Sequence, residues 1–198
     1  MKSIFYLCFL LILTGCSSTL KKSKDYSLHP IFNTHYVCSE HYAGQFQELG
    51  DALGSDCIVQ GFSEFDGKKW LRGHKGDGSA NEDWYGWNSP VLSPVNGEVV
   101  KINFNKIENQ PGVLGKGVAS FIILKKDDGL FVMLAHVRDI KVKIGDKVIR
   151  GKQIASVGNN GKSWHPHIHI GLWRNKKPLQ VKFNQEDMRK FFVDRSFE

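Results

Sequence analysis

The stretch PHIHIGL, residues 166–172, places two histidines two positions apart in a run with the composition of a β-strand. Side chains at positions i and i+2 of a strand point to the same face, so His167 and His169 are expected to project together from a rigid support. Two imidazoles held in this way can bind a metal, or one can bind it while the other transfers a proton. Two exposed histidines on a strand edge would fit the same spacing, so the rest of the chain has to decide.

Short β-strands are predicted upstream of this stretch, and the residues between them have turn chemistry. Strand composition recurs over residues 97–102, 120–125, 130–136, 142–148 and 151–155. Asp127-Asp128-Gly129 is a hairpin turn, Asn159-Asn160-Gly161 is a turn before the histidine strand, and Asn184 can cap a helix over residues 185–193. The sequence therefore predicts a mainly β fold, a folded antiparallel sheet with a short C-terminal helix.

The N-terminus is typical of an exported lipoprotein. Lys2 precedes an apolar run that is too short to span a bilayer and that ends in Leu-Thr-Gly-Cys at residues 13–16. This pattern resembles a bacterial lipoprotein signal, in which the cysteine is lipidated and becomes the new N-terminus. The expected organisation is a signal peptide over residues 1–15, then lipidated Cys16 with a flexible tether over residues 16–34.

The membrane contact expected from this signal is the lipid anchor alone, because no second apolar segment follows. Ser17 after the cysteine favours the outer membrane, facing the periplasm, if the source has two membranes. The net charge of +7 suits an anionic envelope polymer. Lysines are spread along the chain without a basic block interleaved with aromatic residues, so a nucleic-acid partner is not expected.

Two of the four cysteines remain for the folded domain, which is predicted over residues 35–198. Cys8 leaves with the signal and Cys16 carries the lipid. In an exported domain, Cys38 and Cys57 then suggest one disulfide, with two separate buried thiols as the alternative. A cysteine-rich zinc site is disfavoured, since no two cysteines lie close together in sequence.

Four segments, in the same order, resemble the lysostaphin-type (LytM-like) zinc endopeptidases that cut peptidoglycan peptides. PVLSPVNGEVV at residues 90–100 is similar to an early strand of that family, and LAHV at residues 134–137 to its A-H-L segment. Residues 142–154 match its V-x-x-G-x-x-V-x-x-G-x-x-I pattern, and residues 158–169 match its G-x-T/S-G and P-H-L-H motifs. The resemblance covers residues 89–172 and implies a β core of the peptidase or lipoyl-like type.

The resemblance also implies roles for three histidines. The second histidine of H-x-H binds zinc in this family, which makes His169 a ligand, while His136 and His167 become catalytic. A Zn²⁺ ion with three protein ligands lowers the pKa of a bound water and polarises a carbonyl, and a neutral imidazole can accept the water's proton. The implied function is a lipid-anchored zinc metallopeptidase that hydrolyses amide bonds in peptidoglycan peptides.

The other two metal ligands depart from the family pattern, an H-x-x-x-D or H-x-G-x-D motif shortly before the first strand. One interpretation pairs His74 with Asp83 near that position. The other takes Asp56 as the carboxylate ligand, and His41 or, alternatively, His35 as the imidazole ligand.

We favour His41 with Asp56, because some relatives place a similar strand early and follow it with an insertion resembling residues 76–85. A Cys38–Cys57 disulfide would draw the His41 segment towards Asp56. A carboxylate with two imidazoles suits zinc better than magnesium or calcium, which prefer oxygen ligands.

Two other functions stay open at this point. The chain can be a non-catalytic relative that binds peptidoglycan or activates a separate cell-wall hydrolase, but such proteins usually lose zinc ligands. It can also be a lipoyl-like carrier, which would carry a modified lysine and has no use for paired histidines.

Overall fold

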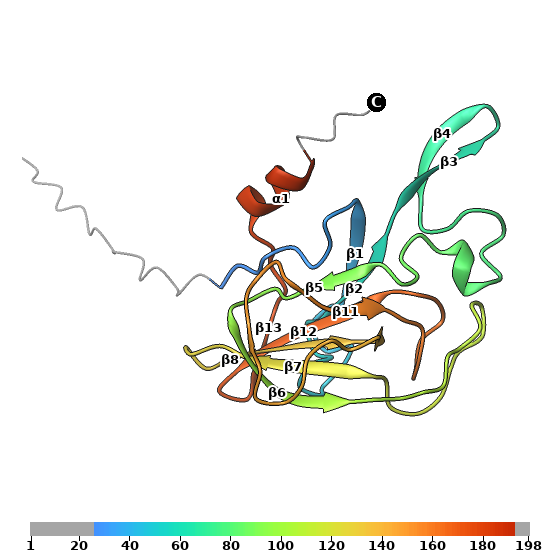
Figure 1. Ribbon diagram of the computed structural model, residues 1–198. Helices are drawn as coiled ribbons and strands as arrows, with labels where there is room; N and C mark the ends of the chain where they lie inside the picture. Colours follow the sequence, from blue (N-terminus) through green and yellow to red (C-terminus); the bar gives the residue numbers. More distant parts are fainter. Residues whose placement is uncertain (1–25, 193–198) are drawn as a thin grey trace, which may run out of the picture.

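The computed structural model describes residues 26–192 and is mainly β, with antiparallel sheets and one short C-terminal helix (Figure 1). The predicted fold class is confirmed. The elements are β1 (Tyr36–Glu40), β2 (Ser55–Val59), β3 (Gly61–Phe65), β4 (Lys68–Arg72), the 3₁₀ helix η1 (Asn81–Asp83), β5 (Pro90–Leu92), β6 (Gly97–Asn103), β7 (Phe121–Lys125), β8 (Leu130–Ala135), β9 (Val137–Arg138), β10 (Lys147–Val148), β11 (Gln153–Val157), β12 (Ile168–Arg174), β13 (Lys177–Leu179) and α1 (Gln185–Phe192). The predicted signal peptide and Cys16 lie outside the described residues.

The largest sheet has the strand order β1-β2-β12-β8-β7-β6-β10, and β13 pairs with β12. Strand β12, which carries His169, therefore lies inside the sheet between β2 and β8. The hairpin β7–β8 turns at Asp127-Asp128-Gly129 as predicted, and Gly129 has the positive φ of 80° that this turn requires. Neighbours on both sides of β12 restrict how its histidine can move.

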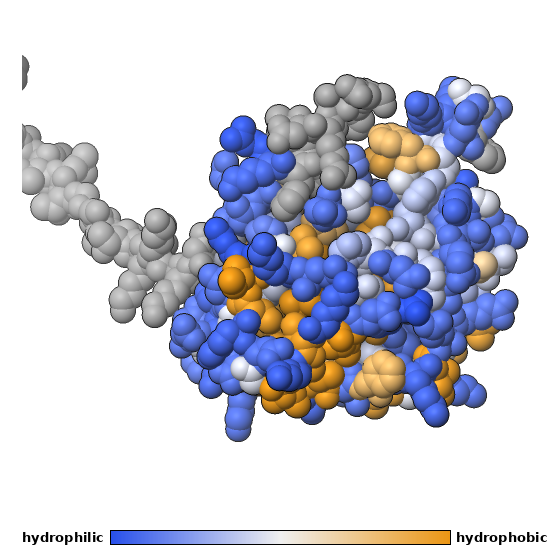
Figure 2. Space-filling view, in the orientation of Figure 1, coloured by the Kyte–Doolittle hydropathy of each residue, from blue (hydrophilic) through white to orange (hydrophobic). Residues whose placement is uncertain are grey.

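A second sheet with the order β5-β11-β9 shares one hydrophobic core with the large sheet. Ile154 and Val157 of β11 are buried in the same cluster as Leu134 of β8 and Ile170 of β12. Figure 2 shows apolar side chains gathered low on the drawn face, with hydrophilic residues around them. The shared core packs the two sheets against each other, and the site is built on that support.

The hairpin β3–β4 projects from the body of the molecule, and its outer end is mostly hydrophilic in the space-filling view (Figures 1 and 2). Its base is attached through Tyr85, whose hydroxyl donates to the main-chain oxygen of Phe62 and contacts the Ser63 hydroxyl. In the sequence, the hairpin lies between β2, which carries Asp56, and the segment that leads into β5.

The N-terminal boundary differs from the predicted one. Leu28, Ile31 and Phe32 are at most 1% exposed in the core, and Leu28 forms a parallel bridge with Phe183. The predicted flexible tether over residues 16–34 was wrong for this part of the segment. The physical reason is burial: each apolar side chain removed from water contributes about 1.5–3 kcal/mol, which outweighs the polar composition of the neighbouring residues.

The segment 142–148 is also less regular than predicted. Only Lys147–Val148 forms a strand, because the main-chain N–H of Lys143 donates to the Asp146 carboxylate and Gly145 adopts a φ of 92°. These contacts favour a turn over an extended chain.

The C-terminal helix α1 begins where Asn184 was expected to cap it, since its side-chain oxygen accepts the N–H of Asp187. Residue 193, the predicted end of the helix, lies outside the described residues. Within residues 26–192, no helix is long and apolar enough to cross a bilayer.

Candidate metal centre

The register of three strands brings the site residues together. His169 in β12 lies directly opposite Asp56 in β2 on one side and opposite Ala135 at the end of β8 on the other. His136 follows Ala135 immediately, so it reaches the same end of β12. His41 follows the last residue of β1, and its main-chain N–H donates to the carbonyl of Gly54 just before β2.

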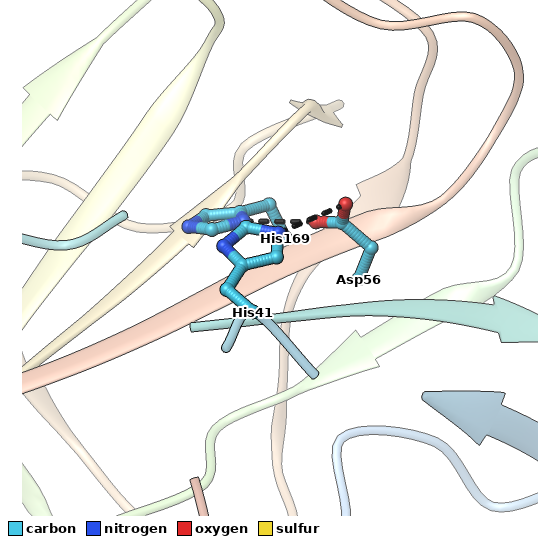
Figure 3. Close-up of side chains that lie close together, drawn as sticks. All are labelled: His41, Asp56 and His169. Carbon is cyan, nitrogen blue, oxygen red and sulfur yellow. Dashed lines mark hydrogen bonds and ion pairs between the residues drawn. The ribbon is translucent and has the colours of Figure 1, made fainter. Parts of the chain in front are cut away.

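One group in the described part of the chain combines three residues able to hold a metal ion: His41, Asp56 and His169. Nδ1 of His169 lies 2.9 Å from one carboxylate oxygen of Asp56, and Nε2 of His41 lies 3.3 Å from the other. The two imidazole rings are stacked, with centroids 5.2 Å apart, and both face the carboxylate (Figure 3). The structure thus brings together the upstream pair that the sequence favoured.

Main-chain carbonyls determine which ring nitrogens carry protons. Nδ1 of His41 donates to the carbonyl of Asp51 over 2.9 Å, and Nε2 of His169 donates to the carbonyl of Gly50 over 2.8 Å. A carbonyl oxygen only accepts, so the neutral rings keep their protons on these nitrogens. The lone pairs of His41 Nε2 and His169 Nδ1 are then left facing the carboxylate of Asp56.

This arrangement fits a zinc ion. Two lone pairs and a carboxylate at 2.9 and 3.3 Å repel one another unless a cation or a proton lies between them. Zinc bonds of about 2.0–2.2 Å in tetrahedral geometry keep ligand atoms about 3.3 Å apart. The two nitrogen–oxygen distances are close to this value, and one ligand atom from each of the three residues lies within 4.8 Å of the others. Metal-bound histidines also commonly donate their second ring N–H to a carbonyl, as both rings do here.

His167 and His136 lie beside this group. Nε2 of His167 is 3.7 Å from the Asp56 carboxylate, and the His136 ring lies 4.5 Å from that of His167 between centroids. His167 donates through Nδ1 to the carbonyl of His165, and His136 donates through Nδ1 to the carbonyl of Asn160. In each neutral ring Nε2 therefore carries no proton and is able to accept one.

The main chain at His136 is unusual, with a φ of 62° at a non-glycine residue. This left-handed conformation costs about 1–3 kcal/mol and is found mostly where function or packing demands it. The carbonyl of His136 accepts the N–H of Gly158, and a Cβ at residue 158 would lie 2.8 Å from that oxygen. The glycine at 158 lets the turn before β12 approach His136 and place the Asn160 carbonyl within hydrogen-bonding distance of its Nδ1.

Burial and neighbouring charges shift the pKa values of these residues in different directions. Burial lowers the pKa of His136 to about 3, assisted by the nearby His167, and it lowers the pKa of His167 to about 4. Burial also disfavours charge on His169, but the hydrogen bond and negative charge of Asp56 outweigh it and raise the pKa of His169. Burial works against ionisation of Asp56 as well, yet the hydrogen bond of His169 and the nearby imidazoles hold the pKa of that carboxyl below its usual range.

The alternative upstream pair does not join the group. His74 packs against Trp84, with ring centroids 5.0 Å apart, and the Asp83 carboxylate accepts the N–H of Ala80. His35, the other imidazole considered, contacts the ring of Phe62. These residues take part in packing and turns and lie outside the group of His41, Asp56 and His169.

The two remaining cysteines, Cys38 and Cys57, form a disulfide. They lie directly opposite each other in the β1–β2 pair, and Cys57 is next to Asp56. Strand alternation turns the Cys57 side chain into the core, where it is fully buried, and away from the carboxylate of Asp56.

The sequence did not predict the four carbonyls that hold the imidazoles, or the role of His165. The ring of His165 stacks on Trp84 at 4.3 Å, and its carbonyl orients His167. Gly50 and Asp51 act through their main chains, for which side-chain patterns give no signal. Only the turn containing Asn160 was visible in the sequence, through its glycine and asparagine content.

Comparison with known proteins identifies one family. The model of peptidase family M23 matches residues 83–181, half of the chain. An uncharacterized metalloprotease of Haemophilus influenzae is 31% identical over 116 residues, which cover 57% of this chain and 22% of that protein. One from Buchnera aphidicola is 31% identical over 94 residues, covering 48% and 22%. The chain thus matches less than a quarter of the length of these curated relatives.

The chain is also similar to two solved catalytic domains. The catalytic domain of the prophage-encoded M23 protein EnpA from Enterococcus faecalis is 21% identical, with a TM-score of 0.48, and the match covers 77% of this chain and 93% of that one. The catalytic domain of lysostaphin from Staphylococcus simulans is 19% identical, with a TM-score of 0.44, and the match covers 73% and 88%.

Proposed function

The chain belongs to peptidase family M23, and from this premise we propose that it is a zinc metallopeptidase that hydrolyses amide bonds in peptidoglycan peptides. One observation carries the proposal: the lone pairs of His41 and His169 converge on the Asp56 carboxylate, beside two further imidazoles with free Nε2 atoms. A chain that had lost its metal site would have no reason to keep this arrangement.

The residues that would hold the metal are His41, Asp56 and His169. Zinc bound there would supply Lewis-acid chemistry, which polarises an amide carbonyl and makes water more acidic. A site with three protein ligands leaves a position for water or substrate, as in other catalytic zinc sites.

His167 and His136 handle the protons of the reaction. Water adds to the amide carbon, and a free imidazole Nε2 accepts the proton that the water gives up. The C–N bond then breaks, and an imidazolium returns the proton to the leaving amine. The carbonyls of His165 and Asn160 hold both rings with Nε2 directed away from the main chain throughout.

Activity on purified sacculi tests the proposal. The full chain should contain about one zinc per molecule and release soluble peptidoglycan fragments from sacculi. The His169→Ala variant should release none, while His74→Ala, a histidine outside the group, should behave as the parent protein does. Undiminished release by His169→Ala would refute the mechanism, and bound zinc without any release would favour a regulator of a separate cell-wall hydrolase.

The proposed site of action is the cell envelope. The lipoprotein-like signal at residues 1–15 supports lipid anchoring through Cys16, and Ser17 supports the outer membrane, facing the periplasm, where the source has two membranes. Cells that express the chain should incorporate labelled fatty acid into it, and Cys16→Ser should abolish the label. Label retained in Cys16→Ser would exclude this anchor.

A further inference from the structure

Two consecutive carbonyls of one loop contact both imidazole ligands. Residues 42–54, here the positioning loop, connect the end of β1 to β2. Within it, the Gly50 carbonyl accepts Nε2–H of His169, and the Asp51 carbonyl accepts Nδ1–H of His41. The Asp51 carboxylate lies 3.4 Å from the same Nε2 of His169 and adds negative charge beside it.

The positioning loop is held in place by its own turns. The N–H groups of Asp51 and Ala52 both donate to the Glu48 carbonyl, and that of Gly54 donates to the Asp51 carbonyl. Ala52 is buried, with 6% of its surface exposed. A loop with these internal bonds can direct two carbonyls at fixed angles.

A glycine in β12 allows the loop to come close enough. A Cβ at Gly171 would overlap the carbonyl group of Gly50, so no larger residue fits at 171 while Gly50 keeps its place. The same strand carries His169 two residues earlier. The contact between Gly171 and Gly50 therefore determines how near the Gly50 carbonyl lies to the His169 ring.

The disulfide closes the base of this loop. Cys38 and Cys57 pair directly across β1 and β2, next to the Ser39–Asp56 pair in the same register. His41 follows β1 on one side of the disulfide, and Asp56 adjoins it on the other. Cross-linking these two strands limits how far His41 can move from Asp56.

We propose that the positioning loop and the Cys38–Cys57 disulfide together preset both imidazole ligands, so that affinity for zinc depends on groups that do not touch the metal. The inference builds on the proposed function, from which it takes the identity of the metal. Without the two carbonyls, each neutral ring would exchange between tautomers and rotate, and only part of the population would present both lone pairs to the ion. Loss of such supporting contacts typically weakens metal binding about 10–100-fold.

The first test displaces the loop without altering any ligand. The full-length Gly171→Ala variant should bind zinc about 10–100-fold more weakly, measured by competition with a chromophoric chelator. Gly86→Ala is the matched control, since a Cβ there meets only ordinary contacts of 3.5 Å or more with Val59 and Val157. The control should bind zinc as tightly as the parent protein.

The second test removes the disulfide that joins the two ends of the loop. The double variant Cys38→Ser/Cys57→Ser should lose at least about 10-fold in zinc affinity while circular dichroism shows that it remains folded. Serines are used because the thiols of a reduced protein would themselves bind zinc. This variant decides the question if Gly171→Ala does not fold.

The third measurement needs no variant. Nitrogen-15 chemical shifts of the imidazoles, in metal-free full-length protein at a pH where they are neutral, should show His41 protonated on Nδ1 and His169 on Nε2. The opposite tautomer at either ring would overturn the inference, and so would unchanged zinc affinity in both folded variants. A parent protein that binds no zinc would instead refute the proposed function, although the tautomers could still be read.

Discussion

Residues 89–172 and residues 26–88 supply the same site by different routes. The downstream region contributes His136, His167 and His169, which lie in short motifs at the ends of neighbouring strands. The upstream region contributes His41 and Asp56, which are separated by a loop and belong to no short motif. The first set depends on local sequence, and the second on a strand pairing and a disulfide.

The comparison teaches that the side chains of a candidate metal site can be brought together without a short sequence motif. Asp56 lies beside His169 because β2 pairs with β12, and His41 follows β1, which pairs with β2 and is joined to it by the Cys38–Cys57 disulfide. A sequence pattern spanning a few residues cannot describe such a ligand set. Four experiments test whether the two regions contribute to the site in these different ways, beginning with the largest expected effect.

Substitution of Asp56 or His41 should abolish metal binding. Asp56→Asn and His41→Gln are expected to weaken zinc binding by more than about 100-fold, since losing a supporting contact alone costs 10–100-fold. The matched variants Asp83→Asn and His74→Gln should keep about one zinc per chain. Elemental analysis after dialysis measures the metal, and a zinc-free Asp83→Asn protein would restore the discarded pair.

Substitution of His136 or His167, the proposed proton-transfer residues, should lower the rate of hydrolysis without loss of the metal. His136→Ala and His167→Ala are expected to keep zinc but to lower the rate of amide hydrolysis by about 10²–10⁴-fold, the usual contribution of a proton-transfer group. Rates on sacculi and zinc content are measured on the same preparations. Loss of zinc in His136→Ala would mean that this residue belongs to the metal set.

Removing the disulfide should destabilise the upstream region. The free energy of unfolding of the Cys38→Ser/Cys57→Ser variant is expected to fall by about 3 kcal/mol, the value typical of a cross-link closing a loop of this size. Urea denaturation of the metal-free proteins measures the difference, and reduced parent protein serves as the control. Equal urea midpoints for the oxidised parent protein and the variant would show that the disulfide does not stabilise the fold.

Acidification should destabilise the metal-free protein through His136 and His167, whereas His169, whose pKa is raised, contributes with the opposite sign. Burial lowers the pKa of His136 to about 3 and of His167 to about 4, so the folded chain takes up fewer protons than the unfolded chain below about pH 6.5. Their contribution to stability is present above that pH and is lost as the pH falls towards 4, by up to about 1.4 kcal/mol per pH unit for each ring. Thermal denaturation from pH 7 to 5 should show a smaller dependence in His136→Gln, and an unchanged dependence would contradict this origin.

Much of the fold could be predicted from the sequence because its strands and turns are local patterns. The hairpin at Asp127-Asp128-Gly129 and the cap at Asn184 depend on a few adjacent residues, and both form as expected. The parts that differ depend on distant contacts. Leu28 and Phe32 are ordered by a core that lies far away in sequence, and that core has no signature in their own neighbourhood.

The candidate site, too, could be predicted only where it depends on adjacent residues. Alternation suggested that His167 and His169 would face the same way, and both do reach Asp56, although β12 begins only at Ile168. The choice between His41 and His74 could not be settled by spacing, because it depends on which upstream strand pairs with β12. The carbonyls of Gly50 and Asp51 could not be inferred at all, since every residue has a carbonyl.

The place of β12 in the sheet has a consequence for biosynthesis. This strand comes late in the chain, yet it lies between β2 and β8, which are made earlier. Until β12 is inserted, no strand connects β2, which carries Asp56, with β8, which ends just before His136, and His169 is missing. A growing chain therefore holds no assembled candidate centre until β12, the last long strand, has been made.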